Sequence, residues 1–393
     1  MSGAFLTLNA GSSSIKFSIY LTDDNLSEQT RGQVENLGPT ARLVLKRKSA
    51  GGDIAKDVSE LGAANHESAL TTILERSGDM IGNERVTGVG HRIAHGGVDF
   101  IKPVVLDDTA IAKLRLLEPL APLHQPHNLK TVDAARAAFP DALQIGCFDT
   151  AFHRSHPWVN DTFALPRHYY ERGVRRYGFH GLSYDFITGE LKRCEPRLFE
   201  GCVVIAHLGN GASMCAVKNG RSIASTMGFS ALDGLPMGTR CGQLDPGVLL
   251  YLMDHDGMNA ADLTTLLYKE SGLKGLSGLS HDMRELSASS APEAKDALSY
   301  YAFRARREVG ALAASLGGLD ALVFTGGIGE NSALMRSMIT EDMGWLGIEL
   351  DDDRNQANAT DIGTGRIRVM VIPTDEERVI ARALQDKMAS TSA

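Results

Sequence analysis

The chain has 393 residues, 43% of them hydrophobic and 22% charged, and its formal net charge at pH 7 is −8. This length predicts two domains with their own hydrophobic cores, and the composition is typical of a folded enzyme. The acidic balance argues against a general nucleic-acid binder, because affinity for the phosphate backbone requires a basic face. No stretch approaches the roughly 20 apolar residues of a membrane span, and the first residues lack a signal-peptide pattern.

The five cysteines are an odd number and include no Cys-x-x-Cys pair, which argues against a disulfide framework and a cysteine zinc site. His91 and His95 have the spacing of a His-Glu-x-x-His motif, but Arg92 stands where that motif has its glutamate. We therefore expect a reduced, cytoplasmic protein that binds neither membrane nor nucleic acid.

The first half begins with a strand over residues 5–9, a small-residue turn at 10–14 and a returning strand over 15–20. Short strands across 30–58, clearest at 42–46, extend this hairpin into a meander. Helical spacing of apolar residues predicts a helix over 66–80, and an apolar strand over 84–92 ends in Arg92. A guanidinium there requires an anion or an acidic partner.

Two further helices and a strand complete this half. Asp107 or Asp108 can cap the first helix, and Pro126 suits the first turn of the second, which runs to Phe139. The strand over 143–148 ends in Asp149, and a carboxylate at a strand end is well placed for chemistry. Helix capping is the alternative role for Asp149.

Loop and helix over 150–199 contain His180, whose glycine neighbours and two nearby arginines favour a role facing an anion. A second strand over 202–208 then enters a turn in which Gly209 and Gly211 allow successive backbone N–H groups to face an anion. Residues 9 and 11 match residues 207 and 209 at one offset of 198, since 207 − 9 = 209 − 11. This offset suggests two duplicated halves that face one polyphosphate.

The last part of the chain predicts helices from residue 246, a long helix over 292–316, strands over 321–325 and 367–372, and a terminal helix over 375–387. The glycines at 326–329 follow a buried strand and open a helix, so a flat or anionic ligand can approach the backbone there. Tight packing of strand against helix is the alternative. Arg240 lies among glycines, where a structural ion pair is the alternative to an anion site.

Known motifs narrow the chemistry further. The sequence holds no Gly-x-x-x-x-Gly-Lys-Ser/Thr loop, and the glycines at 326–329 lack the dinucleotide spacing. The absence of a Gly-x-Ser-x-Gly elbow argues against a serine hydrolase, so the serines at 12–14 more simply supply hydroxyl donors.

Eight segments together resemble the acetate kinase (acetokinase) family of the acetate and sugar kinase, Hsp70 and actin superfamily. The segments are Asn9–Lys16, Gly90–Arg92 with His95–Gly97, Phe148–His153, Arg176–Gly181, His207–Gly211, Met237–Arg240, Thr325–Asn331 and Pro373–Glu377. Eight motifs in the family's order across the whole chain are highly specific. The resemblance favours functional roles for Arg92, Asp149, His180 and Arg240.

The resemblance implies an α/β fold with two ribonuclease-H-like (actin-like ATPase) domains of duplicated topology around an active-site cleft. The N-terminal domain would span 1–149 and be completed by the C-terminal helix at about 376–393, and 150–375 would form the nucleotide-binding domain. It also implies a homodimer that uses ATP/ADP with Mg²⁺ or Mn²⁺. The reaction would be reversible, direct in-line transfer of the γ-phosphoryl group to acetate, which gives acetyl phosphate.

The resemblance also implies roles for individual residues. The catalytic residues would be Asp149, His180 and Arg240, and the substrate would contact Arg92, Ala94, Leu123 and Phe179. The nucleotide would contact Asn9, Lys16, His207, Leu208, Gly209, Asn210, Gly211, Asp282, Met283, Arg284, Gly327, Ile328, Gly329, Glu330 and Asn331. Asn9 and Glu376 would serve the metal ion. Asp149 could act as proton acceptor or donor, or orient metal-bound water and substrate.

Departures from the family pattern leave the substrate open. Ala94 stands where a valine usually lines the methyl pocket, which makes room for one more carbon, so propionate or a range of short-chain acids is the alternative. His127, Cys241, Gln243, Met283 and Asp375 are further departures. A sugar kinase and an ATP-gated binding protein of the same superfamily are the rival hypotheses.

Overall fold

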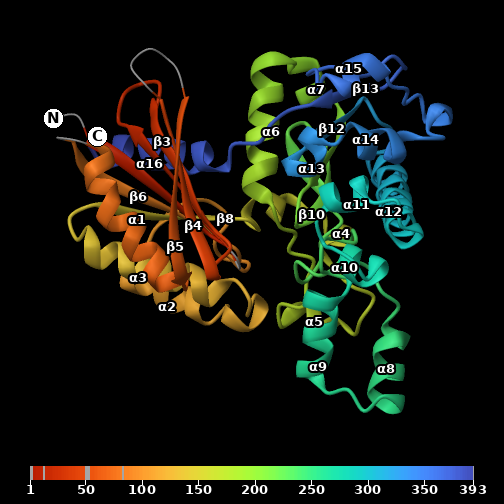
Figure 1. Cartoon of the computed structure of the whole chain (residues 1–393), viewed down its shortest axis with the longest axis horizontal. Helices are drawn as coiled ribbons and strands as arrows, with labels where there is room; N and C mark the ends of the chain where they lie inside the picture. The colour runs from red at the N-terminus through yellow and green to blue at the C-terminus, as the bar shows by residue number, and fades with distance from the viewer. Residues whose placement is uncertain (1–2, 12–13, 49–53, 82–83, 393) are drawn as a thin grey trace. The chain divides into compact units, whose positions relative to one another are not determined.

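The computed structural model describes residues 3–11, 14–48, 54–81 and 84–392. The chain divides into two compact units, one made of Met1–Phe152 with Asp375–Ala393 and the other of His153–Thr374. The boundaries expected from the sequence lie at 149/150 and 375/376. Each unit contains one β-sheet with helices packed against it, and the two are described separately (Figure 1).

The sheet of the first unit has the strand order β5-β4-β3-β2-β1-β6-β8-β7 in the described residues. Its strands are β1 (Gly3–Ala10), β2 (Ile15–Leu21), β3 (Glu28–Glu35), β4 (Gly38–Lys48), β5 (Ile54–Ala64), β6 (Arg85–Ile93), β7 (Val104–Val105) and β8 (Leu143–Phe148). Strands β1 to β5 form an antiparallel meander, and β6 and β8 run parallel to β1. The strands expected to be short are longer, since β4 and β5 each have 11 residues.

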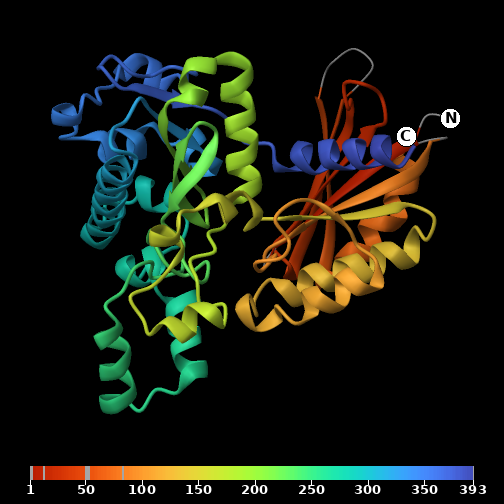
Figure 2. The ribbon, with the colours of Figure 1, turned by 180° about the vertical axis from the view of Figure 1, so that it is seen from behind.

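Helices cover both faces of this sheet, so β1 is buried along its whole length. They are α1 (His66–Ile81), α2 (Asp108–Arg115), the short turn η1 (Glu118–Leu120), α3 (Gln125–Ala138) and α16 (Glu376–Ser392). Even-numbered residues of β1 such as Leu6 and Leu8 belong to the core under α1 and α3. On the other face α16 lies along the sheet (Figure 2), and a Cβ on Gly90 would come within 2.3 Å of Ile380.

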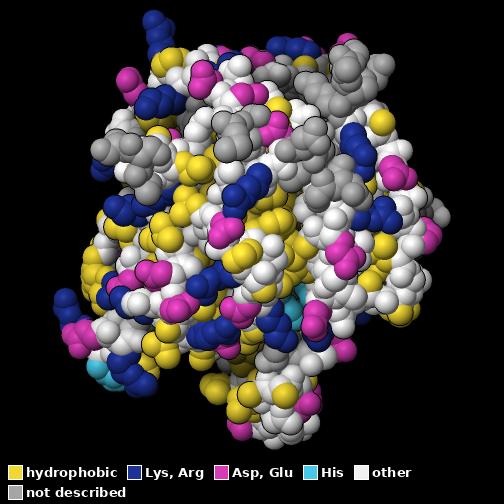
Figure 3. Space-filling view, turned by 90° about the vertical axis from the view of Figure 1, so that its left-hand side faces the viewer, with side chains coloured by type: hydrophobic (Ala, Val, Ile, Leu, Met, Phe, Trp, Pro, Cys, Tyr) yellow, Lys and Arg dark blue, Asp and Glu magenta, His cyan; other side chains and the backbone are white. Residues whose placement is uncertain are grey.

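Local sequence explains where these helices begin. Asp107 caps α2 by accepting a hydrogen bond from the backbone N–H of Ala110, and Pro126 lies in the first turn of α3, where a missing N–H has no cost. Figure 3 shows acidic and basic side chains interspersed across one face. Arg85 and Asp141 form an exposed ion pair of this unit.

The sheet of the second unit has the order β11-β10-β9-β12-β13 in the described residues. Its strands are β9 (Cys202–Leu208), β10 (Ala212–Lys218), β11 (Arg221–Ser225), β12 (Ala321–Thr325) and β13 (Arg368–Val371). Asn219 and Gly220 both have positive φ, 51° and 67°, which the tight hairpin turn between β10 and β11 requires.

The two sheets share one topology. In each sheet a central strand, β1 or β9, has two antiparallel strands on one side and two parallel strands on the other. The spatial order β3-β2-β1-β6-β8 therefore corresponds to β11-β10-β9-β12-β13. The offset of 198 places the last residue of β1, Ala10, on the last residue of β9, Leu208. The predicted α/β fold of duplicated topology is confirmed.

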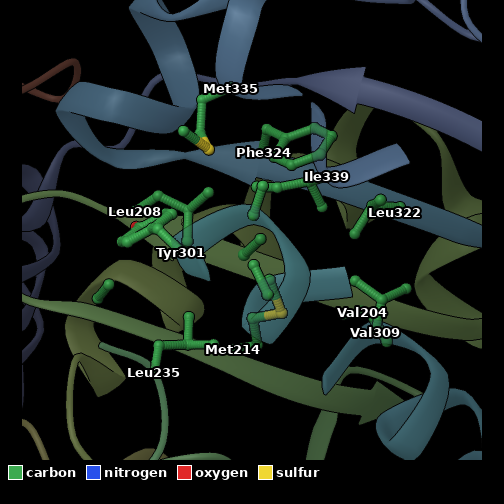
Figure 4. Close-up of a cluster of buried hydrophobic side chains, with 14 of the residues drawn as sticks. Val204, Leu208, Met214, Leu235, Tyr301, Val309, Leu322, Phe324, Met335 and Ile339 are labelled. Carbon is green, nitrogen blue, oxygen red and sulfur yellow. The ribbon is translucent and has the colours of Figure 1, made fainter. Parts of the chain in front are cut away.

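The second unit has helices packed against its sheet and others that extend away from it (Figure 1). They are α4 (Trp158–Asp161), α5 (Arg167–Glu171), α6 (Gly181–Cys194), α7 (Pro196–Glu200), α8 (Pro246–His255), α9 (Ala260–Thr265), α10 (Gly272–Ser277), α11 (Met283–Ala288), α12 (Pro292–Leu316), α13 (Gly326–Asn331), α14 (Ala333–Thr340) and α15 (Asp352–Gln356), with short turns η2 (Ala151–Ser155), η3 (Leu266–Glu270) and η4 (Gly344–Leu346). Figure 4 shows part of the core of this unit, to which Tyr301 and Val309 of α12 and Leu322 and Phe324 of β12 belong. No helix in the described part of the chain is long and apolar enough to span a membrane.

Candidate active site

The candidate functional side chains of the first unit gather where three parallel strands end. The carboxyl ends of β1, β6 and β8 lie at one edge of the sheet and carry Asn9, Arg92 and Asp149. Helix α16 begins at the same edge with Glu376 and Glu377, because Asn9 Nδ2 lies 3.4 Å from Glu376 Oε2 and 3.5 Å from Glu377 Oε1. The first and last parts of the chain thus build one polar cluster.

Arg92 is the centre of this cluster. Its Nε and Nη2 donate to the carboxylate of Asp149 at 2.9 and 2.6 Å, and its Nη1 donates to Asn9 Oδ1 at 2.9 Å. Glu376 Oε2 lies 3.8 Å from Arg92 Nε. Burial lowers the pKa of Arg92, but Asp149 and Glu376 outweigh burial and raise it, so the guanidinium stays charged. The acidic partner expected from the sequence is therefore Asp149.

The cluster holds more negative than positive charge. Asp149, Glu376 and Glu377 are all at least nine-tenths buried, and Arg92 is the cation that contacts them most closely. Burial raises the pKa of Asp149 against the opposing effect of Arg92, and burial together with Glu376 raises the pKa of Glu377. Carboxylate and amide oxygens are the ligands that Mg²⁺ prefers.

We tested whether these residues fit the implied metal ion. No group of three or more His, Cys, Asp and Glu in the described residues is arranged to hold a metal alone. Mg²⁺ usually keeps several waters and takes one or two carboxylates together with phosphate oxygens, so a complete protein cage is not required. The carboxylate and amide oxygens of Glu376 and Asn9 are ligands of the kind that such an ion takes.

Other predicted residues of this unit lie on the adjoining segments. Lys16 is directly opposite Asn9 across the β1–β2 hairpin, and its charge lowers the pKa of Glu377. Ala94 follows β6 and is 8% exposed, and Leu123 is half-buried just before α3. The serines expected to donate at the turn fall partly on residues 12–13, outside the described residues.

In the second unit the turn after β9 forms a second polar centre. A Cβ on Gly211 would lie 3.3 Å from His180 Nε2 and 3.8 Å from Arg240 Nη1, so glycine allows both side chains to approach the backbone. The rings of His180 and His207 stack with their centroids 4.3 Å apart. The structure thus brings His180, His207 and Arg240 together at this turn.

Hydroxyl groups fix the two histidine rings. His180 has a left-handed φ of 58° before α6, and its Nδ1 lies 2.8 Å from Ser213 Oγ, which in turn contacts Tyr184. His207 Nδ1 lies 2.8 Å from Ser183 Oγ. Sequence analysis missed these three hydroxyl residues. Two of them follow His180 at helical spacings of three and four, which is a signal that could have identified them.

Arg240 is held by backbone. Its Nη1 donates to the carbonyl of Ala231 at 2.9 Å.

Phe179, assigned to the substrate, is 4% exposed, and its carbonyl contacts His153 Nε2 at 2.9 Å. Its backbone position therefore depends on His153, whose pKa burial lowers to about 4, so the ring is neutral near pH 7.

The glycine turn after β12 shows the tight packing that was the alternative in the sequence analysis, and one of its glycines is open. A Cβ on Gly326, whose φ is 77°, would lie 2.8 Å from the carbonyl oxygen of Leu208, which shows tight packing against β9. A Cβ on Gly327 would meet nothing within 4 Å, so its backbone is open to approach. Glu330 accepts from the N–H of Gly326 at 2.9 Å and Asn331 donates to the carbonyl of Gly327, so these two side chains hold the turn itself.

The segment 282–284 adjoins the first glycine turn. A Cβ on Gly238 would lie 2.5 Å from Asn210 Oδ1 and 3.2 Å from the carbonyl of His281. Asp282 caps α11 and pairs with Arg284, whose hydrogen bond lowers the pKa of Asp282 to about 2. Met283 is buried in the core between them. These contacts place Asn210 and the 282–284 segment side by side.

Three of the departures noted in the sequence have structural partners. Gln243 accepts from Arg304 at 2.7 Å and also from Arg307. Asp375 pairs with an arginine on β3. His127 stacks on His66 with centroids 4.2 Å apart, and His66 Nε2 contacts the carbonyl of Gly11 at 2.7 Å.

The chain has two β-sheets of one topology, packed with helices, and each has polar side chains at the ends of its central strands. This arrangement defines a duplicated protein of the actin-like ATPase fold. The acetokinase family model matches residues 4–382. The chain belongs to the acetokinase family, which confirms the resemblance seen in the sequence.

Individual relatives agree with this assignment. The chain is 53% identical to an acetate kinase from Methylocella silvestris, over 99% of this chain and 100% of that protein, and 48% identical to one from Nitrobacter hamburgensis, over 96% and 95%. Among solved structures, an acetate kinase from Porphyromonas gingivalis is 38% identical with a TM-score of 0.85. A propionate kinase from Francisella tularensis is 34% identical with a TM-score of 0.90. Each alignment covers 98% of this chain and 99% of the other.

We predict that Glu377→Gln stabilises the ligand-free protein near neutral pH. Because burial and Glu376 raise the pKa of Glu377 above its ordinary value of 4.5, the native state binds this proton more tightly than the unfolded state does. Stability from this group is present at low pH and is lost as pH rises through the native-state pKa. Each pKa unit corresponds to about 1.4 kcal/mol, or about 3–6 °C in a domain of this size.

Thermal unfolding of both proteins from about pH 4 to about pH 8 checks this expectation. The variant should gain in melting temperature relative to wild type as pH rises. Asp386→Asn, which alters an exposed carboxylate on the same helix, should show no such trend. A lower melting temperature of Glu377→Gln at every pH would contradict the excess of buried charge.

Proposed function

We propose that this chain is an acetate kinase that transfers the γ-phosphoryl group of ATP reversibly to acetate and gives acetyl phosphate and ADP. The observation that carries the proposal is the Arg92 cluster at the strand ends of a chain of the acetokinase family. Curated relatives named acetate kinase are 40–53% identical over nearly the whole chain. The protein is a phosphotransferase with a carboxyl group as acceptor.

The physics of direct transfer suits these residue types. A carboxylate is already ionised near pH 7, so the acceptor needs no strong base, and catalysis consists of bringing two anions together and stabilising charge on the equatorial oxygens. We assign Arg92 to the acceptor. Asp149 and Asn9 take three of the five N–H donors of its guanidinium, and the remaining two suit one carboxylate.

Asp149 then has a positioning role in the proposal. It holds the Arg92 fork, and its remaining function is to orient substrate or metal-bound water, or to move a proton. In the second unit His180 and Arg240, which converge on Gly211, stabilise the transferred phosphoryl group. The turn His207–Gly211, segment Asp282–Arg284, turn Gly327–Asn331 and Lys16 hold the nucleotide.

We propose that Asn9 and Glu376 serve Mg²⁺, directly or through water. Mn²⁺ has similar oxygen preferences and is the alternative. When bound, the ion neutralises charge on the ATP phosphates. None of the cysteines that the structure describes is paired in a disulfide, which supports the proposed cytoplasmic location.

Hydroxylamine trapping tests the function. With ATP and acetate, wild type should give acetyl hydroxamate, whereas a sugar kinase acting on a hydroxyl would give none and an ATP-gated binding protein would show slow hydrolysis unchanged by acetate. Arg92→Ala should raise the KM for acetate far more than that for ATP, by about tenfold or more, because a charged hydrogen-bond pair is lost.

Two further variants serve as controls for Arg92→Ala. Arg92→Lys keeps a positive charge beside the acids but lacks the fork, so it should fold and still bind acetate weakly. Arg85→Ala, on the same strand but exposed, should leave both KM values unchanged. Equal changes in the KM for acetate and for ATP would contradict the assignment of Arg92.

Propionate is the alternative acceptor. Ala94 is two residues beyond Arg92, and valine there would add two methyl groups to a position that is 8% exposed. A methylene is worth about 1–3 kcal/mol in such discrimination. Ala94→Val should therefore lower kcat/KM for propionate about tenfold more than for acetate. An unchanged ratio of the two kcat/KM values would remove the steric argument, and the KM for ATP serves as the internal control.

We also propose a homodimer whose interface includes α8. None of the ten residues of α8 is buried in the single chain, although Val248, Leu250, Tyr251 and Met253 are apolar and 39–63% exposed. Exposed apolar surface of this extent is typical of an interface. Light scattering should give about twice 42.3 kDa for wild type.

The variant Leu250→Glu should shift the mass toward one chain. Leu116→Glu, at a leucine of the first unit that is even more exposed, should not. A monomeric wild type, or a dimer unaffected by Leu250→Glu, would contradict this interface.

A further inference from the structure

The strands that carry Asn9 and Arg92 separate just where these residues lie. β1 and β6 pair in parallel from Gly3 opposite Arg85 to Leu8 opposite His91, and the backbone ladder ends there. Asn9 and Arg92 are the next residue on each strand. Their spacing therefore needs support other than the ladder.

Asn128 of α3 supplies a bridge between the two strand ends. Its side chain is 4% exposed, its Nδ2 donates to the carbonyl of Ala10 at 2.9 Å, and its Oδ1 accepts from the N–H of Ala94 at 2.9 Å. A carboxamide has the donor and acceptor of a peptide group, so Asn128 acts as one further rung between β1 and β6. Both partners are backbone groups, so one orientation of the amide satisfies both.

Side chains also hold the three N–H groups that follow Ala94. The N–H of His95 donates to Gln125 Oε1 at 3.1 Å, that of Gly96 to Thr150 Oγ1 at 3.0 Å, and that of Gly97 to His95 Nδ1 at 2.9 Å. Gln125 Nε2 donates back to the carbonyl of His95. The first turn of α3 thus fixes the segment 94–97 through two amide side chains.

We propose that Asn128 is a positioning residue that sets the spacing of Asn9 and Arg92 and the place of the Ala94 methyl group, and thereby the affinity for the carboxylate acceptor. The inference rests on the proposed function for what the strand ends bind. Asn128 acts through backbone groups on both sides, since its two amide atoms are engaged by Ala10 and Ala94.

The test compares Asn128→Ala with Thr131→Ala. Thr131 is on the same helix, 5% exposed, and donates to the carbonyl of His127 at 2.9 Å, so its loss removes one buried hydrogen bond away from the strand ends. Asn128→Ala should raise the KM for acetate about tenfold or more and change the KM for ATP less than about twofold. Amide hydrogen exchange of the peptide that covers 94–97 should become faster. Thr131→Ala should change none of these.

Asn128→Asp takes the place of Asn128→Ala in this test if the alanine variant does not fold. It keeps the oxygen that faces the N–H of Ala94 but presents a second oxygen to the carbonyl of Ala10, so exchange at 94–97 should stay slow while the KM for acetate rises. An unchanged KM and unchanged exchange in Asn128→Ala, or equal increases in the KM for acetate and for ATP, would overturn the proposal. Inactive wild type would instead contradict the proposed function, and hydrogen exchange would still test the bridge.

Discussion

The half-buried guanidinium of Arg92 is the constraint on which the first unit depends. An arginine inside a strand requires acidic partners, and these come from the end of β8 and from the start of α16, with Asn9 and Glu376 separated by 367 positions in the chain. The terminal helix must fold back onto the first sheet to complete the cluster. A buried ion pair of this kind is weak evidence for stability, because desolvation costs about as much as the pair returns. The ion pair matters because it fixes the charged guanidinium of Arg92 at the sheet edge.

In the second unit, the polar centre at the turn after β9 is built from different residue types. Its histidines are oriented by serine hydroxyls, and the missing side chain of Gly211 lets His180 and Arg240 approach the backbone of the turn. The rings of His180 and His207 stack on each other, so the two serine hydroxyls fix both rings as one unit beside the turn.

The sequence predicted the elements that obey local rules. Residues 292–316 and 321–325 form the expected helix and strand because capping, periodicity and β-branching agree there. The strand ends at Arg92 and Asp149 could be predicted in the same way. The bridge made by Asn128 could not, because its partners Ala10 and Ala94 are 118 and 34 positions away and offer only backbone atoms. The length of β5 was also missed, since its alternating charges and glycine weaken the strand pattern.

The strand registers show which positions at the edges of the two sheets are equivalent. With Leu8 placed on Ala206, the parallel pairs Leu8–His91 and Ala206–Phe324 make Arg92 equivalent to Thr325. The next pairs, His91–Gly146 and Phe324–Val371, make Asp149 equivalent to Thr374.

Each half therefore has a matched pair of positions at its sheet edge, charged in the first and hydroxyl-bearing in the second. In the second half, Gly326 follows Thr325 directly, and its N–H and that of Thr374 both donate to Glu330 Oε1. A backbone turn thus takes the place that the ion pair has in the first half. The equivalent sheet edge of the second half therefore carries hydroxyl groups and a carboxylate that accepts from backbone N–H groups, where the first half carries an arginine–aspartate pair.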